Sequence, residues 1–495
     1  MSAEETTIPD QIIPFHLWDD VPYARSVCLN VTLRFDEVLD HLKLEQALTE
    51  LFQQTEWRKL GSRVRENASG RLEYHLPVKF SSDRPGFGFS TAQHDMPILS
   101  HPQASRMPSK PQTPGIHVLG RMSSFTSITK HPNAPCVLQD YLSADVPQLF
   151  IHVLKFTDTT LITVTFPHTL FDAMSLSYFL KAWTSILSGR KDQVPPFLGF
   201  NEDVFAAASE PVPAEQHVLY NQTCGNLKLG VFAFCREWEA YWYPEVEDRA
   251  VVIPHAYIER LRAKALEELR TQTPKGPGPD SNPSNEVFIS EGDIILAWLC
   301  KALGIAMDAY PSTQVCIANV FDARSILGIS QRGAYIGNGT IPCVTVLRAR
   351  NLQQDPVSSL ALRVRQSLLD QRDRSQVYAM DAMRRKAKKE TGFLPVVGDP
   401  RHIPMMGTNW YRARLFDLDF SAARMRVDEG LRNGKPCKPV YINNAGPDPL
   451  TARSIRNFFT VIGKDGDGNW WFQILARATA WKKIEEVLHE LAVEA

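Results

Sequence analysis

The chain lacks the features that assign many proteins to a class at first sight. Its eight cysteines form no Cys-x-x-Cys pair and no zinc-spaced cluster with histidine, which predicts free thiols in a reducing compartment. No run of 18 apolar residues occurs, and the polar, acidic start MSAEETTIPDQ is unlike a secretory signal or a transit peptide. Lys and Arg total 54 against 55 Asp and Glu, so no basic surface for nucleic acid is indicated. We therefore expect a cytoplasmic protein without nucleic-acid or membrane partners.

Signatures of several enzyme classes are also missing. No Gly-x-Ser-x-Gly elbow occurs, which weighs against a serine hydrolase of the α/β type. The glycine-rich stretch from Gly333 to Gly339 lacks the spacing and the strand-to-helix context of a phosphate loop, so it predicts a turn. No metal-binding signature is present, and we expect neither a metal nor a permanently bound cofactor.

Length and composition favour two domains. At 495 residues the chain exceeds what one hydrophobic core usually supports, and its 44% hydrophobic and 22% charged residues are ordinary for a globular protein. We place an N-terminal domain at residues 1–187, a crossover linker at 188–248, where prolines and aromatic residues have little periodicity, and a C-terminal domain at 249–495. Strands and helices mix in both halves, which predicts an α/β fold with the active site between the domains.

Local patterns predict individual elements. Residues 42–52 place Leu44, Leu48 and Leu51 on one helical face, and 149–154 with 161–166 indicate a β-hairpin. Residues 100–135 contain six prolines and predict a long surface loop. In the second half we expect a strand at 251–253, a helix after Pro254, a loop at 273–286, a buried helix from Ser290, a hairpin of 457–462 with 470–475, and a final helix.

One stretch, TLITVTFPHTLFDAMSLSYFLKAW at residues 160–183, combines structural and chemical signals. A strand pattern ends at Pro167, and a helix beginning near Asp172 can anchor four apolar side chains on a core. His168 then lies on the turn between them. A histidine with a pKa near 6.5 can accept a proton from a hydroxyl or an amine at neutral pH. The spacing alone favours a turn histidine followed by a helix-capping aspartate.

Other stretches decide between these interpretations, because together they resemble the motifs of one family. The matching stretches are His168-Thr-Leu-Phe-Asp172, Phe321-Asp-Ala-Arg-Ser325, Tyr335-Ile-Gly-Asn338, Thr408-Asn-Trp410 and Leu415-Phe-Asp-Leu-Asp-Phe420. Their order and spacing are similar to those of the BAHD acyltransferases, and the resemblance spans roughly residues 10 to 490. It implies two chloramphenicol acetyltransferase-like domains, each a mixed β-sheet flanked by helices, with a channel between them.

The resemblance also implies roles for single residues. His168 would be the general base, and Thr408 and Trp410 would lie where the family offers hydrogen-bond donors to the tetrahedral oxyanion. Asp172 would point away from the substrate and pair with Arg324. Asp419 and Phe420 would be structural. Two departures stand out: Ala173 replaces the glycine that usually follows the motif aspartate, and Ser421-Ala-Ala423 replaces Gly-Trp-Gly.

The implied function is acyl transfer, in particular acetyl transfer, from acyl-CoA as co-substrate to a hydroxyl of a small secondary metabolite such as a terpenoid or polyketide. The chain is more similar to fungal members than to plant enzymes, and we expect a monomer acting through a ternary complex. Two alternatives stay open. One is a condensation-like enzyme that takes its acyl group from a carrier protein, although Pro167 replaces the histidine that usually precedes the motif. The other is a cyclase or binding protein on the same fold. The basic run Arg384 to Lys389 fits either coenzyme A phosphates or a solvated helix face.

Overall fold

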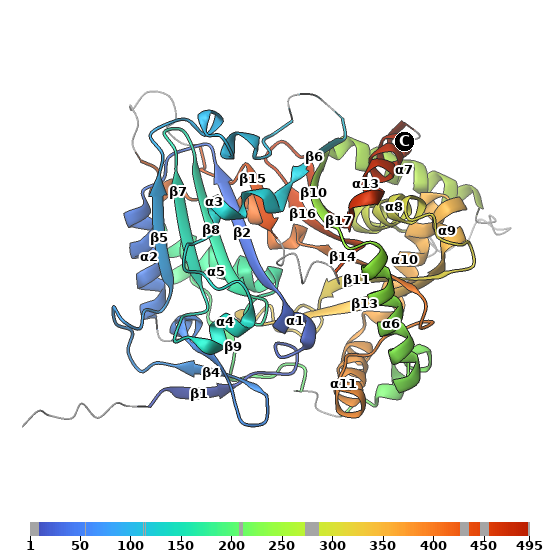
Figure 1. Cartoon of the computed structure of the whole chain (residues 1–495), viewed down its shortest axis with the longest axis horizontal. Helices are drawn as coiled ribbons and strands as arrows, with labels where there is room; N and C mark the ends of the chain where they lie inside the picture. The colour runs from blue at the N-terminus through green and yellow to red at the C-terminus, as the bar shows by residue number, and fades with distance from the viewer. Residues whose placement is uncertain are drawn as a thin grey trace, which may run out of the picture.

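The protein is built from two large sheets, each with its own helices (Figure 1). The computed structural model describes residues 9–54, 56–111, 113, 115–206, 211–272, 287–425, 435–445 and 455–493. A five-stranded sheet occupies the left of Figure 1, and a seven-stranded sheet lies among the helices on the right. The predicted α/β class is therefore confirmed. The loop predicted at 273–286 lies outside the described residues.

The first sheet carries the strand that leads to His168. Its order is β15 (Tyr441–Ala445), β2 (Cys28–Phe35), β8 (Thr160–Pro167), β7 (Phe150–Lys155) and β5 (Gly88–Gln93). β7 and β8 pair antiparallel, which confirms the predicted hairpin. Every residue of β8 is buried, in keeping with its β-branched and aromatic side chains.

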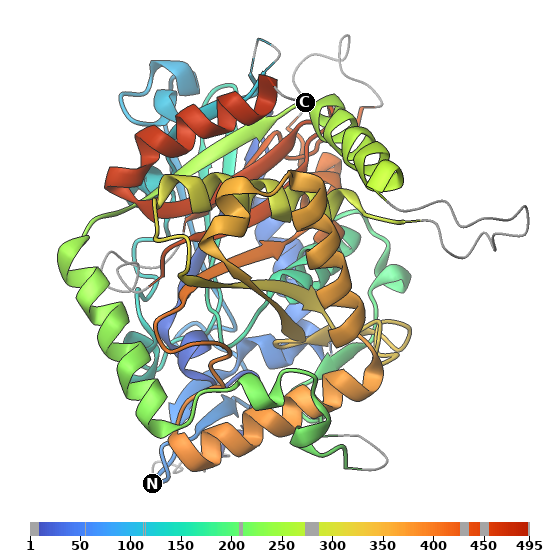
Figure 2. The same cartoon turned by 90° about the vertical axis from the view of Figure 1, so that its right-hand side faces the viewer.

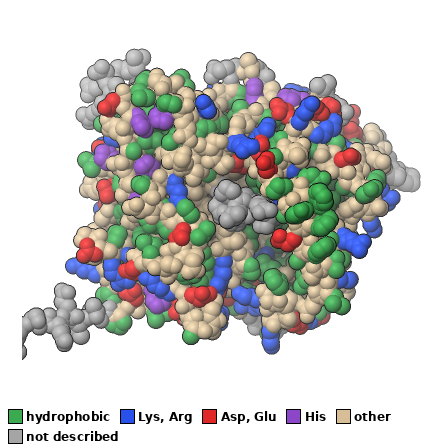
Figure 3. Space-filling model, viewed as in Figure 1, with side chains coloured by type: hydrophobic (Ala, Val, Ile, Leu, Met, Phe, Trp, Pro, Cys, Tyr) green, Lys and Arg blue, Asp and Glu red, His purple; other side chains and the backbone are tan. Residues whose placement is uncertain are grey.

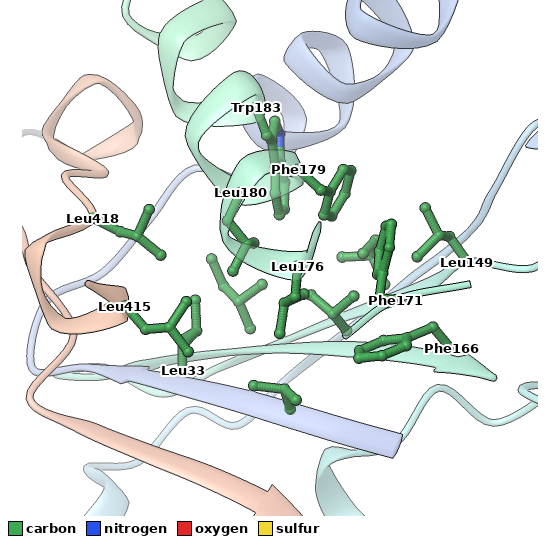
Figure 4. Packing of buried hydrophobic residues seen from close by; sticks show 14 of the residues in the cluster. Leu33, Leu149, Phe166, Phe171, Leu176, Phe179, Leu180, Trp183, Leu415 and Leu418 are labelled. Atoms are coloured by element: carbon green, nitrogen blue, oxygen red, sulfur yellow. The ribbon is translucent and has the colours of Figure 1, made fainter. Parts of the chain in front are cut away.

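Helices α2 (His41–Gln53) and α5 (Ala173–Leu187) cover this sheet, as predicted. Leu176, Leu180 and Trp183 lie on the buried side of α5, and Figure 4 shows them packed above the strands. The indole nitrogen of Trp183 donates to the Leu44 carbonyl at 3.0 Å, which ties α5 to α2. This packing holds the start of α5, and with it the His168 turn, in one position.

The second sheet is mixed and longer. Its order is β13 (Thr340–Arg348), β11 (Gln314–Asp322), β14 (Ile403–Asn409), β16 (Phe458–Lys464), β17 (Trp470–Arg477), β10 (Val246–Ile253) and β6 (His117–Arg121). The helices of this half are α7 (His255–Gln272), α8 (Glu291–Ala306), α9 (Ala349–Gln354), α10 (Val357–Gln371), α11 (Arg374–Thr391) and α13 (Trp481–Val493). The predicted buried helix is α8, whose Ser290 and Asp293 form a capping box. The predicted hairpin of β16 with β17 is also present.

The two halves exchange one strand each. β6 comes from the segment predicted as a long surface loop, yet it pairs with β10 at the edge of the second sheet. β15 comes from the C-terminal half, yet it pairs with β2 in the first sheet. The prediction of a long surface loop over 100–135 is therefore wrong for the part that forms β6. The boundaries at residues 187 and 249 stay a prediction, and any division of the chain has to account for this exchange.

The segment predicted as a crossover without periodicity contains a 17-residue helix, α6 (Asn226–Trp242). Most of its apolar side chains face solvent instead of a core, among them Leu227, Phe234, Trp238 and Tyr241. Hydrophobic side chains accordingly gather over α6 at the right of the face in Figure 3. Prediction of a helix from periodicity assumes that one apolar face packs on the core and that the opposite face is polar. The apolar side chains of α6 do not follow this rule, which is why the sequence did not predict this helix.

Smaller elements complete the fold. They are β1 (Gln11–Pro14), β3 (Arg63–Glu66) and β4 (Leu72–Leu76) in a three-stranded sheet, β9 (Phe197–Gly199) paired with β12 (Ala334–Ile336), and helices α1 (Pro22–Ser26), α3 (Thr126–Thr129) and α4 (Leu138–Ser143). Figure 2 shows α6 and α11 running along the outside of the second half. Within the described residues, none of the helices has both the length and the apolar character needed to cross a bilayer.

Candidate active site

A cavity of about 1050 Å³ lies between the two halves and is lined mostly by apolar side chains. Its wall from the first half includes Leu29, Phe166 and Leu176, and its wall from the second half includes Val320 and Leu475. Four predicted site residues also line it: His168, Asp172, Thr408 and Trp410. Residues that are up to 242 positions apart in the sequence are thus brought to one space, as the motifs predicted.

His168 lies at the point where β8 ends. Its backbone N–H donates to the Val27 carbonyl at 2.8 Å, and its own carbonyl accepts from the Asn338 side-chain amide at 2.9 Å. The imidazole meets the edge of the Tyr23 ring, with 5.1 Å between the ring centroids. Burial lowers the pKa of His168, against smaller opposing effects of its own carbonyl and of Asp172. The imidazole is therefore neutral, and able to accept a proton, at neutral pH.

Asp172 is turned toward the protein and holds the turn together. Its carboxylate accepts two hydrogen bonds from Arg324, at 2.9 and 3.0 Å, and one each from the backbone N–H groups of Ser175 and Gly339, both at 2.9 Å. Burial acts to raise the pKa of Asp172, but the Arg324 guanidinium and the two backbone donors hold it below its usual range. These four hydrogen bonds connect the start of α5 to Arg324 and to the 337–339 turn.

Arg324 connects this carboxylate to the second half. Its Nη2 also donates to the Gly337 carbonyl at 2.7 Å, and its Nη1 to Asp322 at 2.8 Å. A β-carbon at Gly339 would lie 2.7 Å from the guanidinium, so only glycine fits there without displacing Arg324. The stretch predicted as a turn, residues 333–339, contains strand β12 at 334–336, and the chain turns after it. It contacts both ends of the His168 to Asp172 segment, through Asn338 at one end and Gly339 at the other.

Asp19 is a site component that the sequence did not predict. It accepts from the backbone N–H of Asn338 at 2.6 Å and from its side-chain amide at 3.0 Å, although the two residues are 319 positions apart. Burial raises the pKa of the Asp19 carboxyl to about 7, despite the two hydrogen bonds from Asn338. The same amide also donates to the His168 carbonyl, so Asp19 holds the residue that holds His168. No signal in the local sequence points to this contact.

Thr408 lies near the end of β14, and Trp410 follows directly after that strand. Both therefore come from the second half, whereas His168 comes from the first. In the sheet, Thr408 lies between Val320 of β11 and Thr460 of β16. The backbone N–H of Trp410 donates to the Val461 carbonyl at 2.8 Å, which fixes the chain as it leaves the strand. Trp410 is both a buried member of the larger hydrophobic cluster and part of the cavity wall. Trp410 is therefore a core aromatic residue and a residue of the cavity wall at the same time.

Asp419 and Phe420 do not line the cavity. The Asp419 carboxylate accepts from the backbone N–H groups of Ser421 and Cys437, at 2.9 and 3.0 Å, and from the Ser421 hydroxyl at 2.5 Å. Phe420 is fully buried and meets the edge of the Trp183 ring at 5.7 Å. Ser421-Ala-Ala423 forms a 3₁₀ turn whose Ala423 carbonyl accepts from the Asp40 N–H at 2.7 Å. The departure from Gly-Trp-Gly therefore leaves an ordered segment away from the cavity.

A model of a family described as the Transferase family matches residues 122–424, a range that holds every predicted site residue. The chain belongs to this family. The motif-based prediction of a BAHD-type acyltransferase is thereby confirmed. Among the residues that the structure describes, no group of three or more histidine, cysteine, aspartate or glutamate side chains is arranged to hold a metal.

Relatives match over the full length of the chain. "Acetyltransferase adrJ" of Penicillium roqueforti is 37% identical, over 98% of this chain and 97% of its own length. "Acetyltransferase sphE" of Aspergillus fumigatus is 35% identical, over 100% of this chain and 98% of its own. A further relative, 33% identical, bears the name "Transcriptional regulator calD" in Penicillium decumbens. The names of the relatives thus agree on acetyl transfer in most, but not all, of these cases.

The fold is shared with solved structures of much lower identity. The crystal structure of F. graminearum TRI101 complexed with coenzyme A and T-2 mycotoxin superposes with a TM-score of 0.67, is 13% identical, and matches 96% of this chain and 97% of its own. The predicted architecture of two chloramphenicol acetyltransferase-like domains is therefore confirmed.

Proposed function

We propose that the protein transfers an acetyl group from acetyl-CoA to a hydroxyl of a small secondary metabolite, with His168 as the general base. The observation that carries this proposal is the placement of a neutral, partly exposed imidazole in the wall of a large interdomain cavity. The relatives named as acetyltransferases, and the TRI101 complex with coenzyme A and T-2 mycotoxin, support the donor and the kind of acceptor.

The proposed reaction needs one proton carrier and one place for negative charge. His168 takes the proton of the acceptor hydroxyl while the hydroxyl oxygen attacks the thioester carbonyl, and a tetrahedral oxyanion forms. The oxyanion collapses, the bond to the coenzyme A sulfur breaks, and the imidazolium returns its proton to that sulfur. The ester and free coenzyme A are the products. The Thr408 hydroxyl and the Trp410 indole N–H are the proposed donors to the oxyanion.

Asp172 and Arg324 have a proposed role that is separate from proton transfer. Their ion pair joins the first half to the second four residues after His168. Removing one partner would leave the other charge buried and unpaired, which typically costs about 3–5 kcal/mol. We therefore assign them to holding the His168 turn, while His168, Thr408 and Trp410 face the substrates.

The size and the lining of the cavity support a bulky, largely apolar acceptor. Its volume of about 1050 Å³ is at the upper end of the usual range for small-molecule sites. Terpenoids and polyketides with a free hydroxyl fit this description. The cytoplasmic location and the monomeric state stay predictions, and size-exclusion chromatography would test the latter.

A free-thiol release assay tests the proposal. Acetyl-CoA is incubated with a panel of hydroxylated terpenoids and polyketides, using wild type, His168→Ala and, as a matched control, the exposed His489→Ala. We expect acceptor-dependent thiol release that falls roughly 10²-fold or more in His168→Ala, with an unchanged melting temperature and an unaffected control. Full activity in His168→Ala would refute the base assignment. Release only from a phosphopantetheinyl carrier protein would favour the condensation-like alternative.

A further inference from the structure

Arg384, in the basic run on α11, also lines the cavity. Its guanidinium stacks on the indole of Trp18, with 3.7 Å between Cζ and the ring centroid. From the sequence, the run fits either a phosphate contact or a solvated face. In the structure its members have different environments, and only Arg384 of this run is both in the cavity wall and stacked on an aromatic ring of that wall.

Three neighbouring cations of the run are satisfied by protein groups, and the fourth, Lys389, is exposed to solvent. Arg385 donates to Asp381 at 2.7 Å and to Asp203 at 2.9 Å. Lys386 pairs with Glu215 at 2.7 Å, and Lys388 donates to a backbone carbonyl at 2.7 Å. Arg384, by contrast, forms no ion pair and no hydrogen bond with any described residue; its one close contact of this kind is the face of Trp18.

Asp381, whose charge acts on Arg384, and the two aspartates that follow Trp18 in the chain are already engaged by other groups. The two oxygens of Asp381 accept from the Trp18 indole N–H and from Arg385, each at 2.7 Å. Asp20 is paired with Arg25, and Asp19 is held by Asn338. Burial lowers the pKa of Arg384 to about 9, and only Asp381 opposes this effect. Arg384 is half-buried, so its unused donors are left to water, and an anion entering the cavity would replace that water with a charged pair.

The position of Arg384 indicates which substrate supplies that anion. Trp18, on which it stacks, is directly followed by Asp19, which is hydrogen bonded to Asn338 and through it to the His168 carbonyl. Tyr23 of the same segment touches the His168 ring. Arg384 therefore lies on the side of the cavity built by the His168 supports. The phosphates of coenzyme A lie at the far end of the pantetheine arm from the thioester, so the acceptor is the better source of a charge here.

We propose that Arg384, backed by Trp18, binds a carboxylate of the acceptor, so that the natural acceptors are hydroxylated small-molecule acids. This inference rests on the proposed acyl transfer for its biological meaning. Trp18 covers one face of the planar guanidinium and leaves its edge for a bidentate hydrogen-bonded pair with the carboxylate. Binding of the acid would restore the missing counter-charge and orient the hydroxyl relative to His168.

Calorimetric binding without an acyl donor tests the proposal independently of turnover. The probes are steviol and other hydroxylated terpenoid and polyketide acids, each beside its methyl ester, with coenzyme A measured separately. For wild type we expect at least one acid to bind about ten- to a hundredfold tighter than its ester, because a charged pair is lost in the ester. Arg384→Gln should abolish this preference, Arg384→Lys should keep part of it, and neither should change the affinity for coenzyme A.

The remaining outcomes would each overturn the proposal or separate it from the proposed chemistry. Weaker coenzyme A binding in Arg384→Gln, without an effect on the acids, would assign Arg384 to a phosphate. If no acid in the panel bound more tightly than its methyl ester, the proposal that Arg384 binds a carboxylate would be wrong. His168→Ala should keep the acid preference, so a failed transfer assay and a failed Arg384 proposal are distinguishable. Arg385→Gln is the structural control: its melting temperature should fall more than that of Arg384→Gln, and the reverse order would make Arg384 a structural group.

Discussion

Burial determines whether His168 and Asp19, the two titratable groups linked through Asn338, are charged. It keeps His168 neutral by lowering its pKa and favours the protonated form of Asp19 by raising its pKa to about 7. The two groups are linked through Asn338, whose amide donates to Asp19 and to the His168 carbonyl. His168 is therefore held, through Asn338, by a carboxyl group whose own protonation changes near neutral pH.

Asp19→Asn should change how stability depends on pH. The Asp19 carboxyl has a pKa of 3.8 when the chain is unfolded and a pKa of about 7 when it is buried. Between these values the unfolded state loses the proton first, so this group makes the wild type less stable as the pH rises from about 4 to 7. Asparagine does not titrate and keeps an oxygen that can accept from Asn338. We expect the melting temperature of Asp19→Asn relative to wild type to increase from about pH 5 to about pH 8.

The difference between variant and wild type cancels the titration of all other groups. Asp83→Asn, at an exposed position, serves as the control and should show no such trend. A difference for Asp19→Asn that is the same at both ends of this pH range would mean that the Asp19 carboxyl titrates normally in the folded protein.

Local signals account for the elements that the sequence predicted correctly. The strand that ends at Pro167, the helix capped by Asp172 and the capping box at Ser290 each depend on residues only a few positions apart. Asp19 was not predicted, and the sequence could not single out Arg384 within its basic run, because the contacts that set both residues apart are with residues far away in the sequence. The motif resemblance located Asn338 but not its partner, since a motif records which residues recur and not what each one touches.

The turn of residues 337–339 should tolerate no side chain at Gly339. A β-carbon there would lie 2.7 Å from the Arg324 guanidinium, and that guanidinium cannot move without losing Asp172. Gly339→Ala should therefore lower the free energy of unfolding by about 1–3 kcal/mol and reduce transfer activity. Urea denaturation and the thiol assay would measure the two effects.

Gly230→Ala on α6 is the matched control, because a β-carbon at Gly230 would have no neighbouring atom within 4 Å and the helix is exposed. Alanine there should stabilise the protein by about 0.5–1 kcal/mol, since glycine costs more chain entropy in a helix. If Gly339→Ala behaved like Gly230→Ala, the turn would not hold Arg324 in the way described.

At the scale of the whole molecule, the two halves depend on each other more than the predicted boundaries imply. The core of the first half contains Leu415, Leu418 and Phe420 from the C-terminal half, and Figure 4 shows Leu415 and Leu418 beside α5 and β2. β15 pairs with β2 so that Tyr441 lies opposite Arg34. Composition and periodicity predicted two domains, but they could not predict pairing between strands so far apart in the sequence, because strand partners depend on the complete fold.

Separate halves should therefore not fold alone. A fragment of residues 1–187 would lose β15, leaving the edge of β2 unpaired, and would expose the apolar surface that Leu415, Leu418 and Phe420 cover. We expect this fragment and the fragment 188–495 to be insoluble or aggregated when expressed singly, and to form a soluble complex when expressed together. A cooperative thermal transition for residues 1–187 alone, at a melting temperature near that of the full chain, would show that the first half is an independent domain and that strand exchange contributes little to its stability.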